Sequence, residues 1–293
     1  MSAGIAIDSA HNDTYRQLVR LVESSRERRR AQRSVIEGVH LLEALLDVHE
    51  RAAGGRADSI PTIHWVFVPA EVPAGHEISA LLTRLLALPT PPGQTQRARQ
   101  FVLAQALFRR ASQVENGAGP IAVIDTPRPA LPARLPGDTL YLDRVQDPGN
   151  VGSILRTAAA AGMRCVISSP GTAFNWAPKV LRAAMGAHFA LDIYEGIAPE
   201  ALSAALTEGL HWRALVAPEQ AGGATALDEA NLREPSLWLV GNEGQGLGKA
   251  LCADPRVDPV TIDQCAGVES MNVAGAVAVA LFEQRRQRKR AAG

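Results

Sequence analysis

The sequence predicts an α/β protein with a mostly parallel sheet. Short apolar runs typical of strands alternate with segments of helical period from residue 139 onward. Such alternation indicates a parallel sheet covered by helices on both faces. A smaller α/β layer precedes it, and residues 125–138 between the two hold four prolines in fourteen positions, which is typical of a linker. We therefore predict two domains, residues 1–134 with the linker and residues 135–293.

The charge balance excludes a generally basic protein. Thirty Lys and Arg residues offset thirty Asp and Glu residues, so a nucleic-acid partner must be held by local patches. Cys165, Cys252 and Cys265 are far apart and form no CxxC pair, which argues against a disulfide framework or a cysteine zinc site. No signal peptide or apolar run of membrane length is visible. We expect a cytoplasmic protein without a membrane partner or a metal.

Residues 11–33 are predicted to be helical and become strongly basic. Arg26, Arg28, Arg29, Arg30 and Arg33 crowd together, and like charges at this density disfavour a helix. They contact either solvent or an anion such as RNA, and by itself the run favours a solvated arm. The rest of the first domain is predicted to contain strands at 34–36, 63–68, 101–104 and 121–124 and helices at 39–49, 77–88 and 106–113.

The second domain repeats the alternation over a longer stretch. Its predicted helices lie at 151–161, at about 178–185, at 199–208, and from about Val268 to the end of the chain. Its predicted strands lie at 139–145, 163–168, 189–194, 212–216, 237–240 and 257–262.

The first chemically informative stretch is the strand, turn and helix of residues 139–162. Asp147-Pro148-Gly149 makes a sharp turn, and Asn150 occupies the expected N-cap of the helix. Free N–H groups and the helix dipole favour an anion there, and Arg156 adds a charge on the polar face. The alternative is that Arg156 is an ordinary solvated arginine.

The second stretch is GNEGQGLGK, residues 241–249, which follows the strand at 237–240. It is not a P-loop, because Glu243 replaces the first glycine and Ala250 the hydroxyl residue. It also fails the Rossmann pattern, because Lys249 stands at the third glycine position. What remains is a glycine-rich bend at the carboxyl end of a strand, where open α/β sheets bind ligands. Glu243 is either functional or a solvated loop acid.

The third stretch covers residues 260–283. A short strand and a turn precede a helix rich in glycine and alanine, whose small side chains permit close approach of another backbone. That approach could be internal packing or a subunit interface. Ser270 and Asn272 come directly before the apolar run, and plain helix capping is the alternative to a functional role.

The three stretches together resemble a known family. NVGSILRTA, GNEGQG and VESMNVAGAVA are similar, in order and spacing, to the signature motifs of the SpoU/TrmH branch of the SPOUT methyltransferases. The resemblance covers residues 139–285. In the first domain, RSVIEGVHLLEALL and IHWVFV resemble the substrate-binding domain that precedes many of these enzymes and is itself similar to a ribosomal protein that binds bent RNA.

The resemblance implies an RNA 2′-O-ribose methyltransferase that uses S-adenosylmethionine and acts on ribosomal or transfer RNA. It also implies a homodimer and a C-terminal trefoil knot, which few folds contain. By matching positions, the implied catalytic residues are Asn150, Arg156, Glu243, Ser270 and Asn272, and the implied cofactor-binding residues are Gly241, Asn242, Gly246, Ile262 and Met271.

One departure from the family pattern concerns the cofactor loop. Asp263, Gln264 and Cys265 stand where the family usually has Pro-Met, so the loop is expected to differ locally. This departure is the best argument for one alternative, a catalytically silent RNA-binding protein with the same fold. The other alternative is a SPOUT enzyme that methylates a base.

Arginine side chains stay protonated in proteins, so we do not expect Arg156 to serve as a free base. We expect it to fix a phosphate and to polarise the ribose hydroxyl. The proton acceptor is then either a phosphate oxygen or an arginine perturbed on binding.

Overall fold

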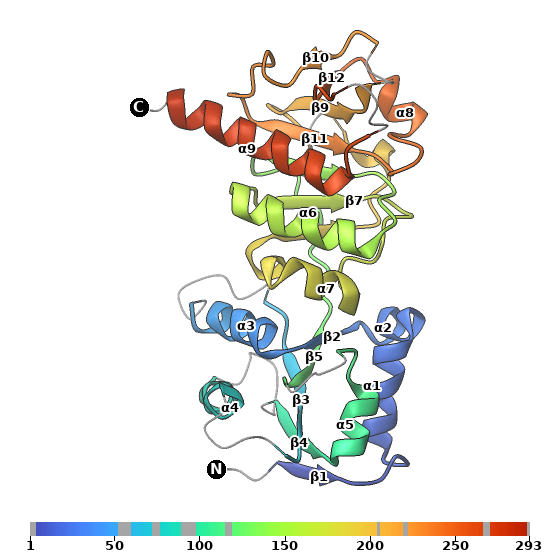
Figure 1. Cartoon of the computed structure of the whole chain (residues 1–293), viewed down its shortest axis with the longest axis vertical. Helices are drawn as coiled ribbons and strands as arrows, with labels where there is room; N and C mark the ends of the chain where they lie inside the picture. The colour runs from blue at the N-terminus through green and yellow to red at the C-terminus, as the bar shows by residue number, and fades with distance from the viewer. Residues whose placement is uncertain are drawn as a thin grey trace. The chain divides into compact units, whose positions relative to one another are not determined.

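A computed structural model describes residues 4–51, 60–71, 77–88, 98–114, 119–203, 206–218, 222–265 and 270–291. The chain forms two compact units (Figure 1). The first unit consists of Met1–Pro127 and Trp176–Phe189, and the second of Arg128–Asn175 and Ala190–Gly293. The units therefore divide within the proline-rich stretch, but residues 176–189, which we placed in the second domain, group with the first unit.

The first unit contains a mixed five-stranded sheet. Three strands run parallel to one another, and β5 pairs antiparallel with both β3 and β2 at the other side. The sheet order is β1 (Ile5–Ile7), β4 (Arg99–Leu103), β3 (Ile63–Pro69), β5 (Ile121–Asp125) and β2 (Arg33–Glu37). β1 was not predicted, because three residues at a sheet edge carry too little alternation to be recognised. The core is centred on Phe67 and Phe101, whose rings stack at 5.0 Å.

Helices surround this first sheet. They are α1 (Asp13–Glu23), α2 (Ser25–Ala31), α3 (Val39–Arg51), α4 (Glu77–Ala87), α5 (Gln105–Ala111) and α7 (Pro178–Ala184). α7 packs against β2, which explains why this segment belongs to the first unit.

Residues 11–33 are mostly helical, as predicted, but they form two helices, because α1 ends at Glu23 and α2 begins at Ser25. Ser24 has an extended backbone, and its hydroxyl accepts a hydrogen bond from the Glu27 N–H at 3.2 Å as the cap of α2. Arg28 is only 6% exposed and donates to the carbonyls of Leu21 and Val22 at the end of α1. The solvated-arm interpretation therefore fails for Arg28, which closes the end of a helix.

The second unit contains a seven-stranded sheet in which every pairing is parallel. This confirms the prediction of an α/β protein with a mostly parallel sheet. The order is β10 (Thr225–Ala226), β12 (Val257–Thr261), β9 (His211–Val216), β11 (Ser236–Val240), β6 (Thr139–Leu142), β7 (Cys165–Ser168) and β8 (Asp192–Glu195).

Two long helices, α6 (Pro148–Ala161) and α9 (Val273–Ala291), pack against each other over one face of this sheet (Figure 1). Trp238 of β11 is fully buried beneath them, and its indole N–H donates to Gln284 of α9 at 2.7 Å. This buried bond holds α9 against the centre of the sheet. The short helix α8 (Lys249–Cys252) follows the glycine-rich bend.

Several predicted boundaries differ from the structure. The strand predicted at 189–194 is a 3₁₀ turn, Ala187–Ala190, followed by β8. In place of the helix predicted at 199–208, the described residues form a 3₁₀ turn, Pro199–Ala201, and a further turn at 206–209. The last helix begins at Val273, and residues 266–269 lie outside the described part of the chain. Proline and glycine near each of these ends leave the sequence pattern ambiguous.

No helix in the described ranges is long and apolar enough to cross a membrane. The same ranges contain no cluster of three or more His, Cys, Asp or Glu side chains that could hold a metal ion. Cys165 is buried, and Cys252 and Cys265 are exposed; all three are free thiols.

Candidate active site

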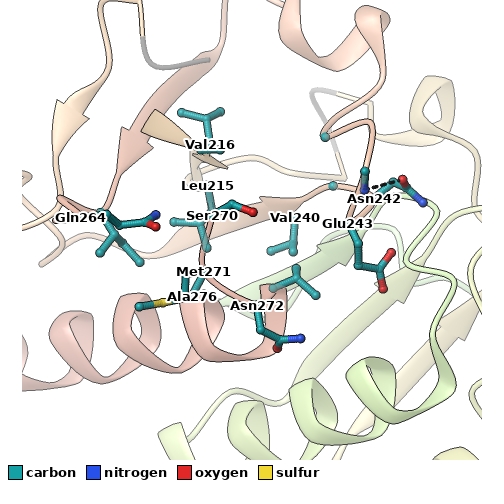
Figure 2. Close-up of a pocket in the computed structure, with 16 residues that line it drawn as sticks. Leu215, Val216, Val240, Asn242, Glu243, Gln264, Ser270, Met271, Asn272 and Ala276 are labelled. Carbon is teal, nitrogen blue, oxygen red and sulfur yellow. Dashed lines mark hydrogen bonds between the residues drawn. The ribbon is translucent and has the colours of Figure 1, made fainter. Parts of the chain in front are cut away.

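A pocket of about 650 Å³ lies at the carboxyl ends of β9 and β11 (Figure 2). Because all strands of this sheet are parallel, the loops that follow them meet at this edge. Leu215, Val216 and Val240 form an apolar wall at the strand ends. The other walls are the bend at 241–246, the segment after β12, and residues 270–276 at the start of α9.

The glycine-rich bend forms its wall with bare backbone. A Cβ atom on Gly241 would lie 2.2 Å from the carbonyl carbon of Gly246, so no other residue fits without moving the backbone. The N–H of Asn242 donates to the Gly246 carbonyl at 3.0 Å, and the return bond measures 2.9 Å. The bend is therefore a closed, tight turn whose shape requires glycine at residue 241.

Asn242 has a mainly structural part in this bend. Its side-chain oxygen accepts from the N–H groups of Gly244 and Gln245, both at 3.0 Å. Its side-chain nitrogen donates to the Arg144 carbonyl at 2.9 Å. Since both ends of the amide already have partners, the Asn242 side chain stabilises the bend.

Asn150 is not the helix N-cap that we predicted. The cap is Asp147, whose carboxylate accepts from the Asn150 N–H at 2.8 Å, and α6 begins at Pro148. Asn150 therefore lies inside the first helical turn. Its side chain can take other partners because Asp147 already satisfies the helix end.

A chain of three polar side chains joins the sequence motifs. The Asn150 side-chain nitrogen donates to Glu243 at 3.1 Å, and its oxygen accepts from the side-chain nitrogen of Asn272 at 3.0 Å. The Asn272 oxygen also accepts from the Ala274 N–H at 2.9 Å at the start of α9. Asn272 thus caps α9 and also links two of the motifs. The capping interpretation is confirmed, and a functional role of Asn272 stays a prediction.

Glu243 is held as a carboxylate. It also accepts from the backbone N–H groups of Gln146 and Asp147, both at 3.3 Å. Partial burial by itself would raise the pKa of Glu243, but the hydrogen bonds from Asn150 and from the backbone outweigh it and lower the pKa below its ordinary value. Glu243 therefore remains ionised at neutral pH and orients Asn150.

Ser270, Met271 and Ile262 line the same pocket. Figure 2 shows Ser270 and Met271 in the segment that leads to Asn272 and α9. Gln264, which belongs to the stretch that departs from the family pattern, also lines the pocket. Residue 266 of that stretch lies outside the described residues.

Arg156 is the predicted site residue that the structure keeps apart. It is exposed on α6 and does not line the pocket, and its side chain makes no hydrogen bond or ion pair to another described residue. It lies six residues beyond Asn150, which is about 9 Å along the helix axis. Its guanidinium is available to a partner outside the chain.

Sequence reasoning missed the apolar wall and Gln264. Leu215, Val216 and Val240 are the last residues of buried strands, and the rule that ligands bind at strand carboxyl ends could have identified them. Gln264 follows β12 in the same way, but it was interpreted only as a departure from a motif.

The fold and the pocket define an α/β protein that binds an organic ligand at the carboxyl edge of a parallel sheet. Residues 138–282 match the SpoU rRNA Methylase family. An uncharacterized tRNA/rRNA methyltransferase of Synechocystis is 31% identical over 96% of this chain and 94% of its own length. The chain belongs to the SpoU rRNA methylase family.

Two further proteins illustrate the range of the similarity. The 23S rRNA (guanosine(2553)-2′-O)-methyltransferase RlmP of Bacillus subtilis is 26% identical over 95% of this chain and 98% of its own length. The AdoMet-bound rRNA methyltransferase of Sinorhizobium meliloti has the same fold, with a TM-score of 0.77 at 22% identity. That match covers 96% of this chain and 97% of the S. meliloti chain.

Proposed function

We propose that this protein transfers a methyl group from S-adenosylmethionine to a ribose 2′-hydroxyl of ribosomal or transfer RNA. The observation that carries the proposal is that two distant motifs line one pocket and the third is joined to them there, because Asn150 bonds to both Glu243 and Asn272. The names of the relatives support it, because the B. subtilis protein is a 2′-O-methyltransferase of 23S rRNA.

The residues around the pocket fit S-adenosylmethionine. A volume of about 650 Å³ lies within the usual range for small-molecule sites. The apolar wall of Leu215, Val216 and Val240 suits an aromatic base, and the bend at residues 241–246 lines the pocket beside it. The residues that would hold the cofactor are Gly241, Asn242, Gly246, Ile262 and Met271. When bound, the cofactor supplies a methyl group on a positively charged sulfur.

The residues of this chain would contribute alignment and electrostatics. Asn150, Glu243 and Asn272 fix the start of α6 against the start of α9, and Ser270 lies beside them at the pocket. Arg156 would hold an RNA phosphate through its planar guanidinium and polarise the attacking hydroxyl. The hydroxyl proton would pass to a phosphate oxygen or to an arginine perturbed by RNA binding.

The assembly that we propose is a homodimer. Val279 and Phe282 of α9 are 41% and 47% exposed, and exposed apolar side chains on one helix support an association surface. A second subunit could bring RNA to Arg156, which the pocket of one chain leaves outside. Light scattering on the full chain at micromolar concentration should give twice the chain mass, and a monomeric mass would contradict the dimer.

We also propose that the second domain contains a trefoil knot, that the two domains divide at residue 134, and that the protein is cytoplasmic. The resemblance implies that the knot involves the C-terminal segment of the chain. The first unit would bind the RNA, since exposed arginines of α2 give it a local basic surface in a chain without net charge.

Two measurements on the chelator-treated full chain test the reaction class. Calorimetry should show binding of S-adenosylhomocysteine, and labelled methyl groups transferred to RNA should appear on ribose after nuclease digestion. Absence of binding at millimolar ligand would favour a catalytically silent RNA-binding protein. Label on a base would instead favour a base-methylating enzyme of the same fold.

A further inference from the structure

A buried carboxylate outside the proposed catalytic set joins three loops at the pocket edge. Asp143 follows β6 directly and is 2% exposed. It accepts from the Gly248 N–H at 2.7 Å, from Arg144 Nε at 3.1 Å and Nη2 at 3.0 Å, and from the Ser169 hydroxyl at 3.3 Å. Gly248 follows β11 and Ser169 follows β7, so one side chain connects the ends of three strands.

Arg144 extends this connection to the glycine-rich bend. Its backbone has φ +56°, an uncommon conformation for a residue other than glycine, and its N–H donates to the Ser169 hydroxyl at 2.9 Å. Its carbonyl accepts from Asn242, and its Nη1 donates to Gln245 at 3.3 Å. With Gly248 bonded to Asp143, the bend is held at its start, middle and end.

We propose that Asp143 is a positioning residue for the ligand pocket, acting through Arg144 and Gly248 to hold residues 241–248 in the shape that binds the cofactor. The inference rests on the proposed function, because it takes S-adenosylmethionine as the ligand of this pocket. A bend ordered in advance spares the ligand the cost of ordering it, and the apparent dissociation constant rises in inverse proportion to the fraction of molecules that keep the competent shape.

The substitution Asp143→Asn separates this role from simple packing. The two side chains have nearly the same volume, but an amide nitrogen would face the N–H donors of Gly248 or Arg144 and leave a donor unpaired in a buried place. The backbone of the bend should then sample open shapes. The apolar wall and the RNA-facing residues stay unchanged.

The test uses the full chain without RNA, and the probe is S-adenosylhomocysteine. In Asp143→Asn, its dissociation constant should rise by roughly tenfold or more, as expected when the competent shape falls to a tenth of the population. Amide hydrogens at residues 244–248 should exchange faster in the ligand-free protein. Methyl transfer at saturating cofactor should fall much less than the affinity, which distinguishes positioning from a direct catalytic contact.

Asp254→Asn is the matched control. Asp254 also pairs with a nearby arginine in two-point geometry, at 2.9 and 2.6 Å from Arg256, but its carboxylate makes no hydrogen bond to residues 241–248. Its substitution should leave cofactor affinity and exchange at the bend unchanged. If Asp143→Asn does not fold, Gln245→Ala removes only the bond from Arg144 and should weaken binding in the same direction by a smaller factor.

A folded Asp143→Asn protein with normal cofactor affinity and normal amide exchange would overturn the inference. If Asp143→Asn does not fold, a Gln245→Ala protein with normal cofactor affinity would overturn it instead. The wild-type protein is measured first. If it fails to bind the probe, the proposed function fails, whereas the exchange data still test whether Asp143 orders the bend.

Discussion

The pocket edge of the second unit and the basic helix α2 of the first unit hold their polar side chains in different ways. At the pocket edge, Glu243, Asn150 and Asn272 bond to one another and to backbone groups. On α2, Arg26 and Arg29 project from the surface, and Arg30 forms a 3.5 Å ion pair with Glu27. Aligning a reaction requires fixed geometry, whereas attracting a phosphate backbone requires mainly charge.

Within α2 the same contrast separates neighbours in sequence. Arg28 is buried and donates two hydrogen bonds to the end of α1, at 2.6 and 2.9 Å, while Arg29 and Arg30 are exposed. One arginine of the run thus stabilises the fold, and its exposed neighbours are the ones that we propose to contact RNA. Substitutions can test both halves of this contrast.

The largest effect is expected at Arg156. Arg156→Lys should keep the fold and cofactor binding but lower methyl transfer by roughly a hundredfold or more, the scale of lost transition-state electrostatics. Lysine offers a point charge instead of a planar fork for a phosphate. Arg156→Ala should lose more activity without unfolding, because an exposed helix position accepts alanine. The assay is transfer of labelled methyl to RNA.

Arg164→Lys is the control for this experiment, since Arg164 is an exposed arginine of the same unit that lies outside the pocket lining. It should retain normal turnover. If Arg156→Lys also retains near-normal turnover, Arg156 is an ordinary surface arginine and the proposed mechanism is wrong.

A smaller effect is expected on α2. Replacing Arg26, Arg29 and Arg30 with alanine should weaken RNA binding. The slope of log binding constant against log salt concentration should become shallower by up to roughly 0.7 to 0.9 for each RNA phosphate that the variant no longer neutralises. Cofactor affinity and melting temperature should stay unchanged. Binding is measured by titration at several salt concentrations. An unaltered slope would mean that these three arginines are solvated surface residues that do not contact RNA.

Arg28→Ala probes the buried member of the same run. It should lower the stability of the protein by about 2 kcal/mol, because it removes charged hydrogen bonds from two helix-end carbonyls. Its effect on the salt slope should be small. Thermal melting provides the measurement, and an unchanged melting temperature would mean that the buried arginine contributes no more than its exposed neighbours.

The smallest effect is expected from pH at Glu243. Its pKa is lowered in the folded protein, so its contribution to stability is complete above its ordinary value of 4.5 and is lost as pH falls through the lower folded value. Below pH 4.5, the wild type should therefore lose more stability than Glu243→Gln. Melting curves between neutral pH and about pH 3 compare the two proteins, with other carboxylates contributing equally to both. Parallel curves would contradict the prediction.

The fold class and most of the regular elements follow from the amino-acid sequence alone. Helical and strand periods are local properties, so α3, α4, β9 and β11 were predicted within one or two residues. The sequence also identified eight residues that the structure brings to one pocket: Gly241, Asn242, Glu243, Gly246, Ile262, Ser270, Met271 and Asn272. The resemblance to the SpoU/TrmH signature motifs made this possible, because it implied which positions of each motif belong to the site.

How these residues are used became clear only from the packing of the elements in space. Asp147 replaced Asn150 as the helix cap, and the released Asn150 side chain found partners 93 and 122 residues away. Arg28 turned inward to carbonyls of the preceding helix, and Asp143 gathered loops from three strands. Such pairings depend on which elements meet in the folded chain, and neither side-chain period nor local propensity carries that information.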